Sequence, residues 1–382
     1  MPRSDNIASI EDLRRRARRS LPRAIFDFID GGSQDEVTLA ANRRDFERIA
    51  LMPRVLTDVS TRQLSTTLLG ERLALPLIAA PTGLAGLVAR KGEVAEARAT
   101  EAAGIPYCLS QMAASSIEEV KAATRRAFWF QSYLVKDRGI NETLMERAAS
   151  AGCKVLVVTL DTKAQGPRER DMRNGFTVPP RVTWRNALDV LRRLDWIRDV
   201  AMGPRVTFAN LAGSLVGSSD IISIARFAAE QYDFSVSWLQ IDWCRSRWDG
   251  KLVLKGILTA EDARLAVEHG ADAVIVSNHG GRQLDHSRSA IAALPAVVDA
   301  VGDRTEVILD GGVRRGSDII KALALGARAC MAGRPFLYGL AAGGERGVTR
   351  AIELLRNELD VNLALLGCAS VQTLDRSAIR MP

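Results

Sequence analysis

Three observations predict an α/β fold, a closed parallel (βα)8 barrel of the TIM-barrel type. Short apolar runs rich in β-branched residues alternate with helix-like segments along most of the chain, as successive βα units do. The runs are apolar throughout, which fits strands that are buried on both faces of a parallel sheet. No G-x-G-x-x-G turn follows an early strand, so an open doubly wound sheet is the second choice.

The expected strands and their connections divide the chain as follows. Residues 1–74 precede the first strand and are expected to form an N-terminal helical cap. The interval between the fourth and fifth strands is too long for one helix, so we expect an insertion there, at residues 181–235. No shift in composition marks a second domain, so residues 1–382 are expected to form one barrel domain. The eight strands are expected at residues 75–81, 107–110, 128–133, 154–161, 252–256, 273–279, 306–312 and 328–334.

The composition is that of a globular protein with a basic surface. Of 382 residues, 47% are hydrophobic and 25% are charged, and the formal net charge is +7. A basic balance favours anionic ligands, a membrane surface or nucleic acid without choosing among them. Aromatic residues make up only 5% and do not interleave with basic ones, so we expect no nucleic-acid partner. Five widely spaced cysteines favour a reducing, cytoplasmic compartment.

Polar and charged residues follow almost every apolar run, at the carboxyl end of the expected strand. In an α/β barrel these ends lie on one face, where the active site forms. A single polar residue there could simply cap a loop, but so many at one end indicate a binding site. The strand ends, with the prolines and glycines that accompany the polar residues, comprise Pro81, Thr82, Gly83, Ser110, Gln131, Tyr133, Thr159, Asp161, Lys255, Ser277, His279, Asp310, Gly312, Gly333 and Arg334.

The last two strand ends have the composition of an anion site. The run "DGGVRRG" pairs two glycines with Arg314, and "AGRP" places Gly333 and Arg334 before a helix. Barrels often hold a phosphate after strands seven and eight, on backbone N–H groups and cations. A tight turn with solvated arginines is the alternative. The chain has no Walker, H-E-x-x-H or C-x-x-C motif, so neither an NTPase nor a zinc enzyme is indicated and no metal is expected.

Longer motifs also occur in a fixed order along the chain. They read "FDFIDGG", "APTG", "FQSY", "TLDT", "GPRERDMRNGF", "SNHGGRQLD", "LDGGVRRG", "LALGA" and "GRPFLYGLA". Together they resemble the FMN-dependent 2-hydroxy-acid dehydrogenase and oxidase family, which includes L-lactate dehydrogenases, glycolate oxidases and mandelate dehydrogenases. The resemblance extends from Ile10 to Thr373 and is weakest in residues 181–235. It implies the cofactor FMN and the oxidation of an L-2-hydroxy acid, lactate-like or larger, to the 2-keto acid.

The resemblance implies how the substrate is held and deprotonated. His279 resembles the catalytic base that takes the hydroxyl proton, a task that suits an imidazole near neutral pH. Asp161 matches the carboxylate that orients this ring and stabilises the imidazolium. Arg168 and Arg282 match the pair that binds the substrate carboxylate, which guanidinium groups can do through two hydrogen bonds. Tyr133 matches the hydroxyl group that bonds the substrate.

The resemblance also implies which residues bind FMN. Lys255 matches the catalytic lysine beside the N1–C2 carbonyl edge of the flavin, where a fixed cation stabilises the charge of the reduced ring. Contacts with the ring are expected from Pro81, Thr82, Gly83, Ser110, Gln131 and Thr159. Contacts with the ribityl chain and phosphate are expected from Ser277, Asp310, Gly312, Arg314, Gly333 and Arg334.

Three positions depart from the family pattern. Phe28, in "FDFIDGG", stands where the family usually has a tyrosine that bonds the substrate carboxylate, so a hydrogen bond of about 1.5–3 kcal/mol is lost. Met112 stands where glycolate oxidases have tryptophan, and Gly83 stands where several oxidases have alanine. Both changes open the pocket toward a substrate larger than glycolate. Phe28 supports the alternative of a catalytically weakened flavoprotein, against which His279 and its partners argue.

Part of the insertion has the pattern of an amphipathic helix. In residues 186–201 apolar residues recur at three- and four-residue spacing, with arginines off the stripe and Trp184 and Trp196 close by. Basic residues with interfacial tryptophans can lay a helix on an anionic membrane. A surface helix that packs on the barrel is the alternative.

The resemblance bears on partners as well. The dehydrogenase branch of the family is often membrane-associated through this insertion and passes electrons to the respiratory chain. It implies a cytoplasmic protein with peripheral contact at the inner face of the cell membrane, a quinone or cytochrome as electron acceptor, and a homo-tetramer. A soluble oxidase of the glycolate or mandelate type that uses O2 is the alternative.

Overall fold

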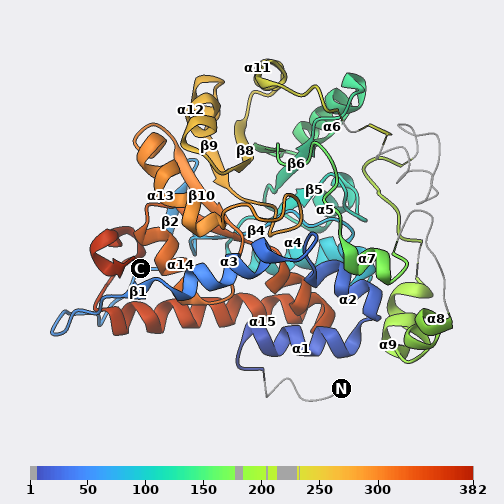
Figure 1. Cartoon of the computed structure of the whole chain (residues 1–382), viewed down its shortest axis with the longest axis horizontal. Coiled ribbons are helices and arrows are strands. Elements are labelled where there is room, and N and C mark those ends of the chain that lie inside the picture. Colours follow the sequence, from blue (N-terminus) through green and yellow to red (C-terminus); the bar gives the residue numbers. More distant parts are fainter. Residues whose placement is uncertain (1–6, 177–183, 204, 213–229, 232, 382) are drawn as a thin grey trace.

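The computed structural model is a parallel eight-stranded barrel (Figure 1). It describes residues 7–176, 184–203, 205–212, 230–231 and 233–381. Neighbouring strands follow chain order from β5 to β11, and β11 is hydrogen-bonded to β4. A parallel bridge between Ala79 and Tyr107 joins the ends of the sheet, so the predicted (βα)8 barrel is confirmed. The strands are β4 (Leu77–Ala79), β5 (Cys108–Ser110), β6 (Trp129–Tyr133), β7 (Val155–Thr159), β8 (Lys251–Ile257), β9 (Ala273–Val276), β10 (Glu306–Asp310) and β11 (Ala329–Ala332).

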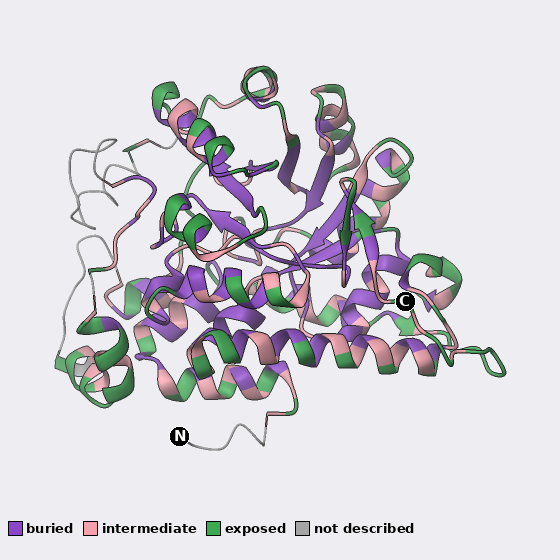
Figure 2. Ribbon diagram, turned by 180° about the vertical axis from the view of Figure 1, so that it is seen from behind, coloured by how far each residue is buried: buried purple, intermediate pink, exposed green. Residues whose placement is uncertain are grey.

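Helices surround the barrel, and the strands they cover are buried (Figure 2). A continuous hydrophobic cluster fills the space between strands and helices. A separate cluster inside the barrel includes Ile78, Val157, Val253, Ile275 and Met331. This double burial explains why the strand sequences are apolar throughout rather than alternating. The covering helices are α4 (Gly92–Ala103), α5 (Ile117–Ala123), α6 (Arg138–Ser150), α12 (Ala260–Glu268), α13 (Ala290–Val301), α14 (Gly316–Ala324) and α15 (Arg334–Leu366).

Most predicted strands extend past the observed ones because the loops of the site begin at those ends. β9 ends at Val276, whereas the prediction ran to His279, whose φ of 58° is left-handed. β8 is longer than predicted and contains a bulge between Lys255 and Ile257. The bulged Gly256 has a φ of 105°, and a Cβ atom there would lie 2.9 Å from Cβ of Asp161. Glycine at this position therefore makes room for Asp161.

The N-terminal cap consists of α1 (Ile10–Ser20), α2 (Arg23–Asp30), α3 (Val37–Glu47) and the hairpin β2 (Thr66–Leu68) and β3 (Glu71–Leu73). In Figure 1, α1 lies along α15, and β1 (Ala50–Leu51) pairs with β12 (Ile379–Arg380) near the other terminus. Leu68 and Leu73 of the hairpin join the cluster inside the barrel. The backbone N–H of Ser33 donates to the carbonyl oxygen of Gly281, at 2.9 Å, so the cap reaches the loop after β9.

The insertion between β7 and β8 contains α7 (Glu169–Arg173), α8 (Trp184–Leu191), α9 (Leu194–Trp196), the π-helical turn η3 (Ile197–Ala201) and α11 (Trp238–Arg247). The prediction of one helix over residues 186–201 is wrong, because helical structure is interrupted at Arg192 and Arg193. Residues 181–183, 204, 213–229 and 232 of the predicted insertion lie outside the described part. None of the described helices is long and apolar enough to cross a membrane.

Candidate active site

His279 and Asp161 form a hydrogen-bonded pair beyond the carboxyl ends of β9 and β7. His279 Nδ1 lies 2.9 Å from Asp161 Oδ1. Burial would raise the pKa of Asp161, but the charge and hydrogen bond of His279 and the charge of Lys255 lower this pKa overall, so the carboxyl group is ionised. Because a carboxylate only accepts, we assign the ring proton to Nδ1, which leaves Nε2 with its lone pair. Such an imidazole can take a proton from a bound substrate.

The loop that carries His279 is held in an uncommon backbone conformation. His279, Gly280 and Gly281 have φ values of 58°, 65° and 75°. A Cβ atom at Gly281 would lie 2.6 Å from the backbone nitrogen of Leu39, so the close approach of the cap requires glycine. The backbone N–H of His279 donates to Ser277 Oγ at 3.0 Å. Left-handed non-glycine residues are rare outside functional sites and turns, which agrees with the predicted role of His279.

Lys255, Ser277 and Asp310 form a buried network across β8, β9 and β10. The Lys255 ammonium lies 2.8 Å from an Asp310 carboxylate oxygen and donates to Ser277 Oγ at 2.9 Å. The hydroxyl group of Ser277 donates to Asp310 at 2.8 Å. Burial would lower the pKa of Lys255, but the charges of Asp310 and Asp161 raise it overall. The site therefore contains a fixed cation whose position two carboxylates determine.

Several buried polar atoms at the strand ends have no partner in the described part of the chain. They are Thr82 Oγ1, Gln131 Nε2, Thr159 Oγ1 and Asp161 Oδ2. Gln131 is oriented by Ser110, whose hydroxyl group donates to its Oε1 at 3.0 Å. Buried polar groups without a partner are uncommon in native proteins, and a cluster of them around one barrel end indicates a polar ligand.

Two arginines lie against the ring of Phe28 on the cap side of the site. The Arg282 and Arg168 guanidinium carbons lie 5.2 Å and 5.7 Å from the ring centroid. Arg282 donates to the carbonyl oxygens of Phe28 and Gly31 at 2.7 Å and 3.0 Å, and Arg168 pairs with Asp171 at 3.0 Å. Burial, and then the charges of Arg168 and Arg334, hold the pKa of Arg282 well below its usual range. Such a concentration of positive charge favours an anion.

Tyr133, at the end of β6, belongs to the same group of residues. The charge of Asp171 and then the phenol group of Tyr133 partly oppose the lowering of the pKa of Arg282. The backbone N–H of Tyr133 donates to Gln111 Oε1 at 2.8 Å, which fixes the strand end. The predicted substrate-binding residues therefore come from the segments that follow β6, β7 and β9, and Phe28 of the cap packs against two of them.

The predicted phosphate residues surround the loop after β10 and the start of α15. Gly312 has a φ of 84°, and a Cβ atom there would lie 2.1 Å from the carbonyl oxygen of Asn42. Arg314 lies over the Tyr338 ring, and Gly333 precedes α15 beside Thr82. Arg334 donates to the carbonyl oxygens of Ile29, Gly280 and Gly31 at 3.1, 2.9 and 2.8 Å. Arg334 thus joins the end of α2 to the loop of His279, a role that the sequence did not indicate.

Sequence reasoning missed the residues through which the cap supports this site. Asp30 of α2 is buried and binds Arg14 Nε at 2.6 Å, the Tyr338 hydroxyl group at 2.7 Å and Arg170 at 3.3 Å. Asn42 and Asn278 exchange two side-chain hydrogen bonds of 2.9 Å. Asp30, Asn42 and Asn278 each lie in a segment whose sequence pattern predicts only a helix or a loop. Their partners come close only in the folded chain.

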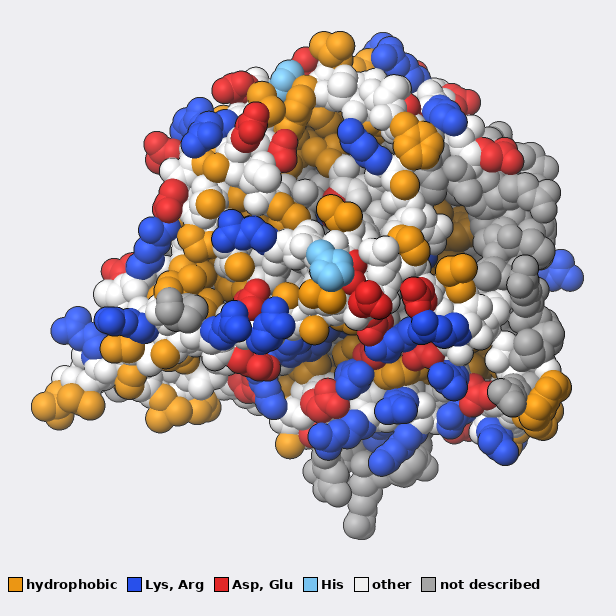
Figure 3. Space-filling model, viewed as in Figure 1, with side chains coloured by type: hydrophobic (Ala, Val, Ile, Leu, Met, Phe, Trp, Pro, Cys, Tyr) orange, Lys and Arg blue, Asp and Glu red, His pale blue; other side chains and the backbone are white. Residues whose placement is uncertain are grey.

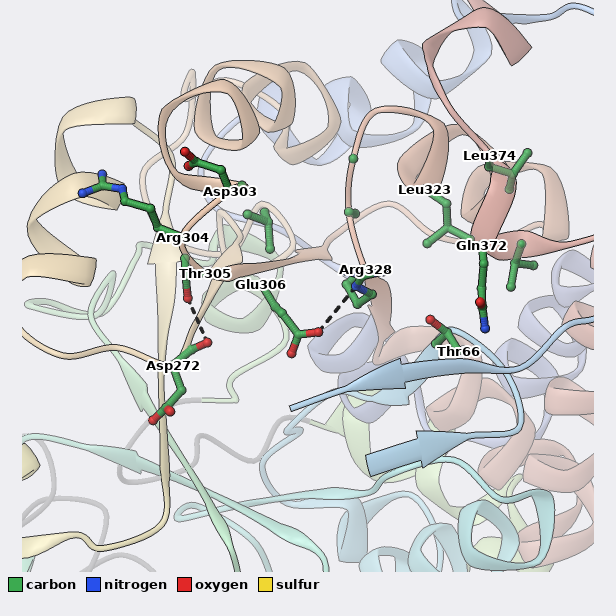
Figure 4. Close-up of a pocket in the computed structure, with 15 residues that line it drawn as sticks. Thr66, Asp272, Asp303, Arg304, Thr305, Glu306, Leu323, Arg328, Gln372 and Leu374 are labelled. Atoms are coloured by element: carbon green, nitrogen blue, oxygen red, sulfur yellow. Dashed lines mark hydrogen bonds and ion pairs between the residues drawn. The ribbon is translucent and has the colours of Figure 1, made fainter. Parts of the chain in front are cut away.

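A cavity of about 460 Å³ lies at the opposite end of the barrel (Figure 4). Its walls include Asp272, Thr305 and Arg328, which immediately precede β9, β10 and β11. Glu306 and Arg328 form an ion pair of 3.4 Å within it. It contains none of the predicted site residues, and active sites of barrels form at the other end. The polar cluster around His279 is therefore the candidate active site.

A model of the FMN-dependent dehydrogenase family matches residues 17–381. The chain belongs to this family. The predicted family, the prediction of a flavin-dependent oxidoreductase and the cofactor FMN are thereby confirmed. The site fits this cofactor, because Gln131 and Thr159 offer buried polar atoms without a described partner that could bind the heteroatoms of a flavin ring, and Lys255 could supply a cation to it.

Relatives match the chain over nearly its whole length. The L-lactate dehydrogenase of Caulobacter vibrioides is 45% identical over 98% of this chain and 97% of its own. The L-lactate dehydrogenase of Vibrio cholerae is 42% identical over 98% and 99%. Among solved structures, the monotopic membrane protein (S)-mandelate dehydrogenase has a TM-score of 0.95 at 39% identity, over 99% of this chain and 100% of that chain. Mandelate oxidase has a TM-score of 0.84 at 39% identity, over 98% of both chains.

Proposed function

We propose that this FMN-dependent dehydrogenase oxidises an L-2-hydroxy acid, with L-lactate as the first candidate, to the 2-keto acid. The observation that carries the proposal is the His279–Asp161 pair beside the arginines on Phe28. A base and an anion site in one place suit a substrate with a carboxylate next to a hydroxyl group. The L-lactate dehydrogenases among the relatives support lactate.

In the proposed reaction the arginines bind and the histidine removes a proton. Arg168 and Arg282 hold the substrate carboxylate, and the hydroxyl group of Tyr133 helps to orient it. The Nε2 atom of His279 takes the hydroxyl proton, and Asp161 stabilises the resulting imidazolium. FMN, when bound, supplies the acceptor for the hydrogen and two electrons that leave the substrate carbon. Lys255 places positive charge beside the group that becomes reduced.

The electron acceptor and the location form a second part of the proposal. Trp184, Leu191 and Leu194 are 70%, 62% and 60% exposed, which is unusual for a surface that meets only water. Lys and Arg side chains gather over the N-terminal helices in Figure 3, and α8 contacts α2. This arrangement supports peripheral contact with an anionic membrane and a quinone or cytochrome as acceptor. It agrees with the monotopic mandelate dehydrogenase relative.

A substrate and acceptor screen tests the proposal. Purified protein loaded with FMN is offered L-lactate, (S)-mandelate and glycolate, with D-lactate as the stereochemical control, and either a redox dye, a soluble quinone or O2. We expect fast reduction of the dye and quinone with an L-2-hydroxy acid, slow reaction with O2 and sedimentation with anionic vesicles. The mandelate oxidase relative favours the second candidate, an O2-dependent oxidase, which fast peroxide formation without vesicle binding would establish.

A further inference from the structure

Two carboxyl groups are buried on α4, outside the site already described. Glu93 is 0% exposed and Glu96 is 1% exposed. Within the described residues, neither forms a salt bridge. Burying a carboxyl group without a cation is costly, so the contacts of each side chain must explain its presence.

Glu93 bonds to two different loops at the carboxyl end of the barrel. Its Oε1 atom accepts hydrogen bonds from the backbone N–H of Ala114 at 2.7 Å and of Gly86 at 3.4 Å. Its Oε2 atom accepts one from the hydroxyl group of Ser115 at 3.1 Å. Gly86 belongs to residues 80–91 after β4, here called the β4 loop. Ala114 and Ser115 belong to residues 111–116 after β5, here called the β5 loop.

The same two loops meet again beside the strand ends of the site. The backbone N–H of Leu84 donates to the carbonyl oxygen of Met112 at 3.0 Å. A Cβ atom at Gly83 would lie 3.2 Å from that oxygen, and one at Gly86 would lie 2.6 Å from Cβ of Ala114. The β4 and β5 loops are therefore in close contact at both glycines, and residue 86 must be glycine to allow this approach.

Two residues of the β4 loop have a strained backbone conformation. Leu84 and Lys91 have left-handed φ values of 56° and 52°. Such conformations of non-glycine residues cost on the order of 1–3 kcal/mol each and persist only where surrounding contacts enforce them. Gly86 lies between Leu84 and Lys91 in the sequence. Its hydrogen bond to Glu93 can therefore help to hold both residues in their left-handed conformations.

We propose that Glu93 is a positioning residue for the oxidation, because it holds the β4 and β5 loops together so that Gly83 and Met112 form a rigid wall of the active site. Naming the reaction rests on the proposed function, whereas the contact between the loops does not. Glu93 touches neither the substrate nor the cofactor site directly and acts through the backbone of Gly86 and Ala114.

Glu96 provides a matched control on the same helix. Burial raises the pKa of Glu93, while hydrogen bonds from Ala114, Ser115 and Gly86 oppose the rise. Burial and the neighbouring Glu93 raise the pKa of Glu96 further, and its Oε1 atom has no partner among the described residues. Among the described residues, the side chain of Glu96 bonds to neither the β4 loop nor the β5 loop.

The test compares Glu93→Ala with Glu96→Ala in the FMN-loaded enzyme. Both variants remove a buried carboxyl group from α4, but only the first releases the loops. We expect Glu93→Ala to accelerate amide hydrogen exchange in residues 83–87 and 111–115 and to lower kcat between about 10-fold and 100-fold. The affinity for pyruvate, followed by the flavin absorption, should change less than about twofold, because Arg168 and Arg282 bind the carboxylate. Glu96→Ala should leave exchange in both loops at the wild-type rate.

Two conservative variants keep the test decisive if Glu93→Ala does not fold. Glu93→Gln can still accept from the two N–H groups and can donate to Ser115, so it should restore most of the turnover. Glu93→Asp keeps the carboxyl group on a shorter side chain that cannot reach both loops, so it should retain the faster exchange. Wild-type exchange in Glu93→Asp, or equal effects of Glu93→Ala and Glu96→Ala, would overturn the proposal. Faster exchange in a protein that oxidises no 2-hydroxy acid would instead refute the proposed function and leave the role of Glu93 intact.

Discussion

The indole N–H of Trp196 donates to the carbonyl oxygen of Leu87 across 2.8 Å. This bond joins α9 of the insertion to the β4 loop. A second bond joins the following turn η3 to the same loop, because the backbone N–H of Arg90 donates to Asp199 at 3.0 Å. The segment with exposed apolar side chains is therefore attached directly to a loop of the candidate active site.

The insertion should be divisible into a removable part and an essential part. Asn210 is fully buried, accepts a hydrogen bond from the N–H of Ile117 at 2.9 Å and donates to the carbonyl oxygen of Ser110 at 3.3 Å. Replacing residues 184–203 by a short linker should abolish vesicle binding and retain dye reduction within about tenfold of the wild type. Extending the replacement to residue 212 should remove most activity, because the support of Ser110 is lost. Equal activity of the two variants would show that Asn210 is dispensable.

His279→Ala should abolish turnover without loss of flavin. Removal of a general base typically costs about 10²–10⁴-fold in rate, and the phosphate and ring contacts come from other residues. His269→Ala is the matched control, because His269 also has an aspartate partner, Asp242, at 2.6 Å, on the outer helices. Steady-state kinetics and the flavin absorption spectrum are the measurements. A His279→Ala enzyme that works at the wild-type rate would refute the assignment of the base.

Phe28→Tyr should tighten substrate binding. The ring already lies beneath both arginines, so a hydroxyl group on it adds a donor to the carboxylate site. A hydrogen bond to a charged group contributes about 1.5 kcal/mol or more, so we expect KM to fall about tenfold while kcat changes little. Phe176→Tyr is the control, because its ring packs against Phe28 at 4.9 Å and no arginine of the described residues lies over it. An unchanged KM would mean that the carboxylate does not reach residue 28.

Asp30→Asn should destabilise the fold in a pH-dependent way. Burial raises the pKa of Asp30, but the hydrogen bonds from Arg14 and Tyr338 lower it to about 2, below the 3.8 of the unfolded chain. The ionised carboxylate therefore stabilises the fold above pH 3.8, and this contribution disappears as the pH falls toward 2. We expect Asn to lower the free energy of unfolding by about 2 kcal/mol at pH 7 and by much less near pH 2.

Chemical denaturation at several pH values measures this effect. Asp360→Asn is the control, because Asp360 also binds an arginine, Arg62, through two hydrogen bonds of 2.7 and 2.8 Å. The Asp360 side chain is 35% exposed against 6% for Asp30, so the loss of its charge should matter far less. Equal losses for the two variants would contradict a special role for Asp30.

The barrel and the position of its active site follow from the sequence because both depend on local patterns. Apolar strand runs mark the barrel, and residues such as His279 and Lys255 end those runs. Strand ends were overestimated because the polar residues that follow the apolar runs, such as Ser277, were counted as strand, although the loops of the site begin with them. The helix over residues 186–201 was predicted whole because its apolar spacing continues across Arg192 and Arg193, where the backbone leaves the helix.

The supporting residues could not be predicted because their partners are distant in the chain. No pattern in the sequence around Asp30 indicates that Arg14, Arg170 and Tyr338 bind its carboxylate. Glu93 reads as an ordinary residue in the first turn of a helix, where acidic residues are common. Only the closed barrel shows that its carboxylate faces inward, toward two loops.

The bond from Tyr338 to Asp30 spans 308 residues, and the bond from Arg334 to Ile29 spans 305. A ribosome that adds about 5–20 residues per second needs roughly 15–60 s to make the intervening chain. Throughout that time α2 has none of its partners on α15, and the first barrel strand lacks its neighbour β11. Arg334 cannot join Arg168 and Arg282 in the site until translation is nearly complete. The loop of His279, to which Arg334 is bonded, therefore gains its support from α15 only when nearly the whole chain has been made.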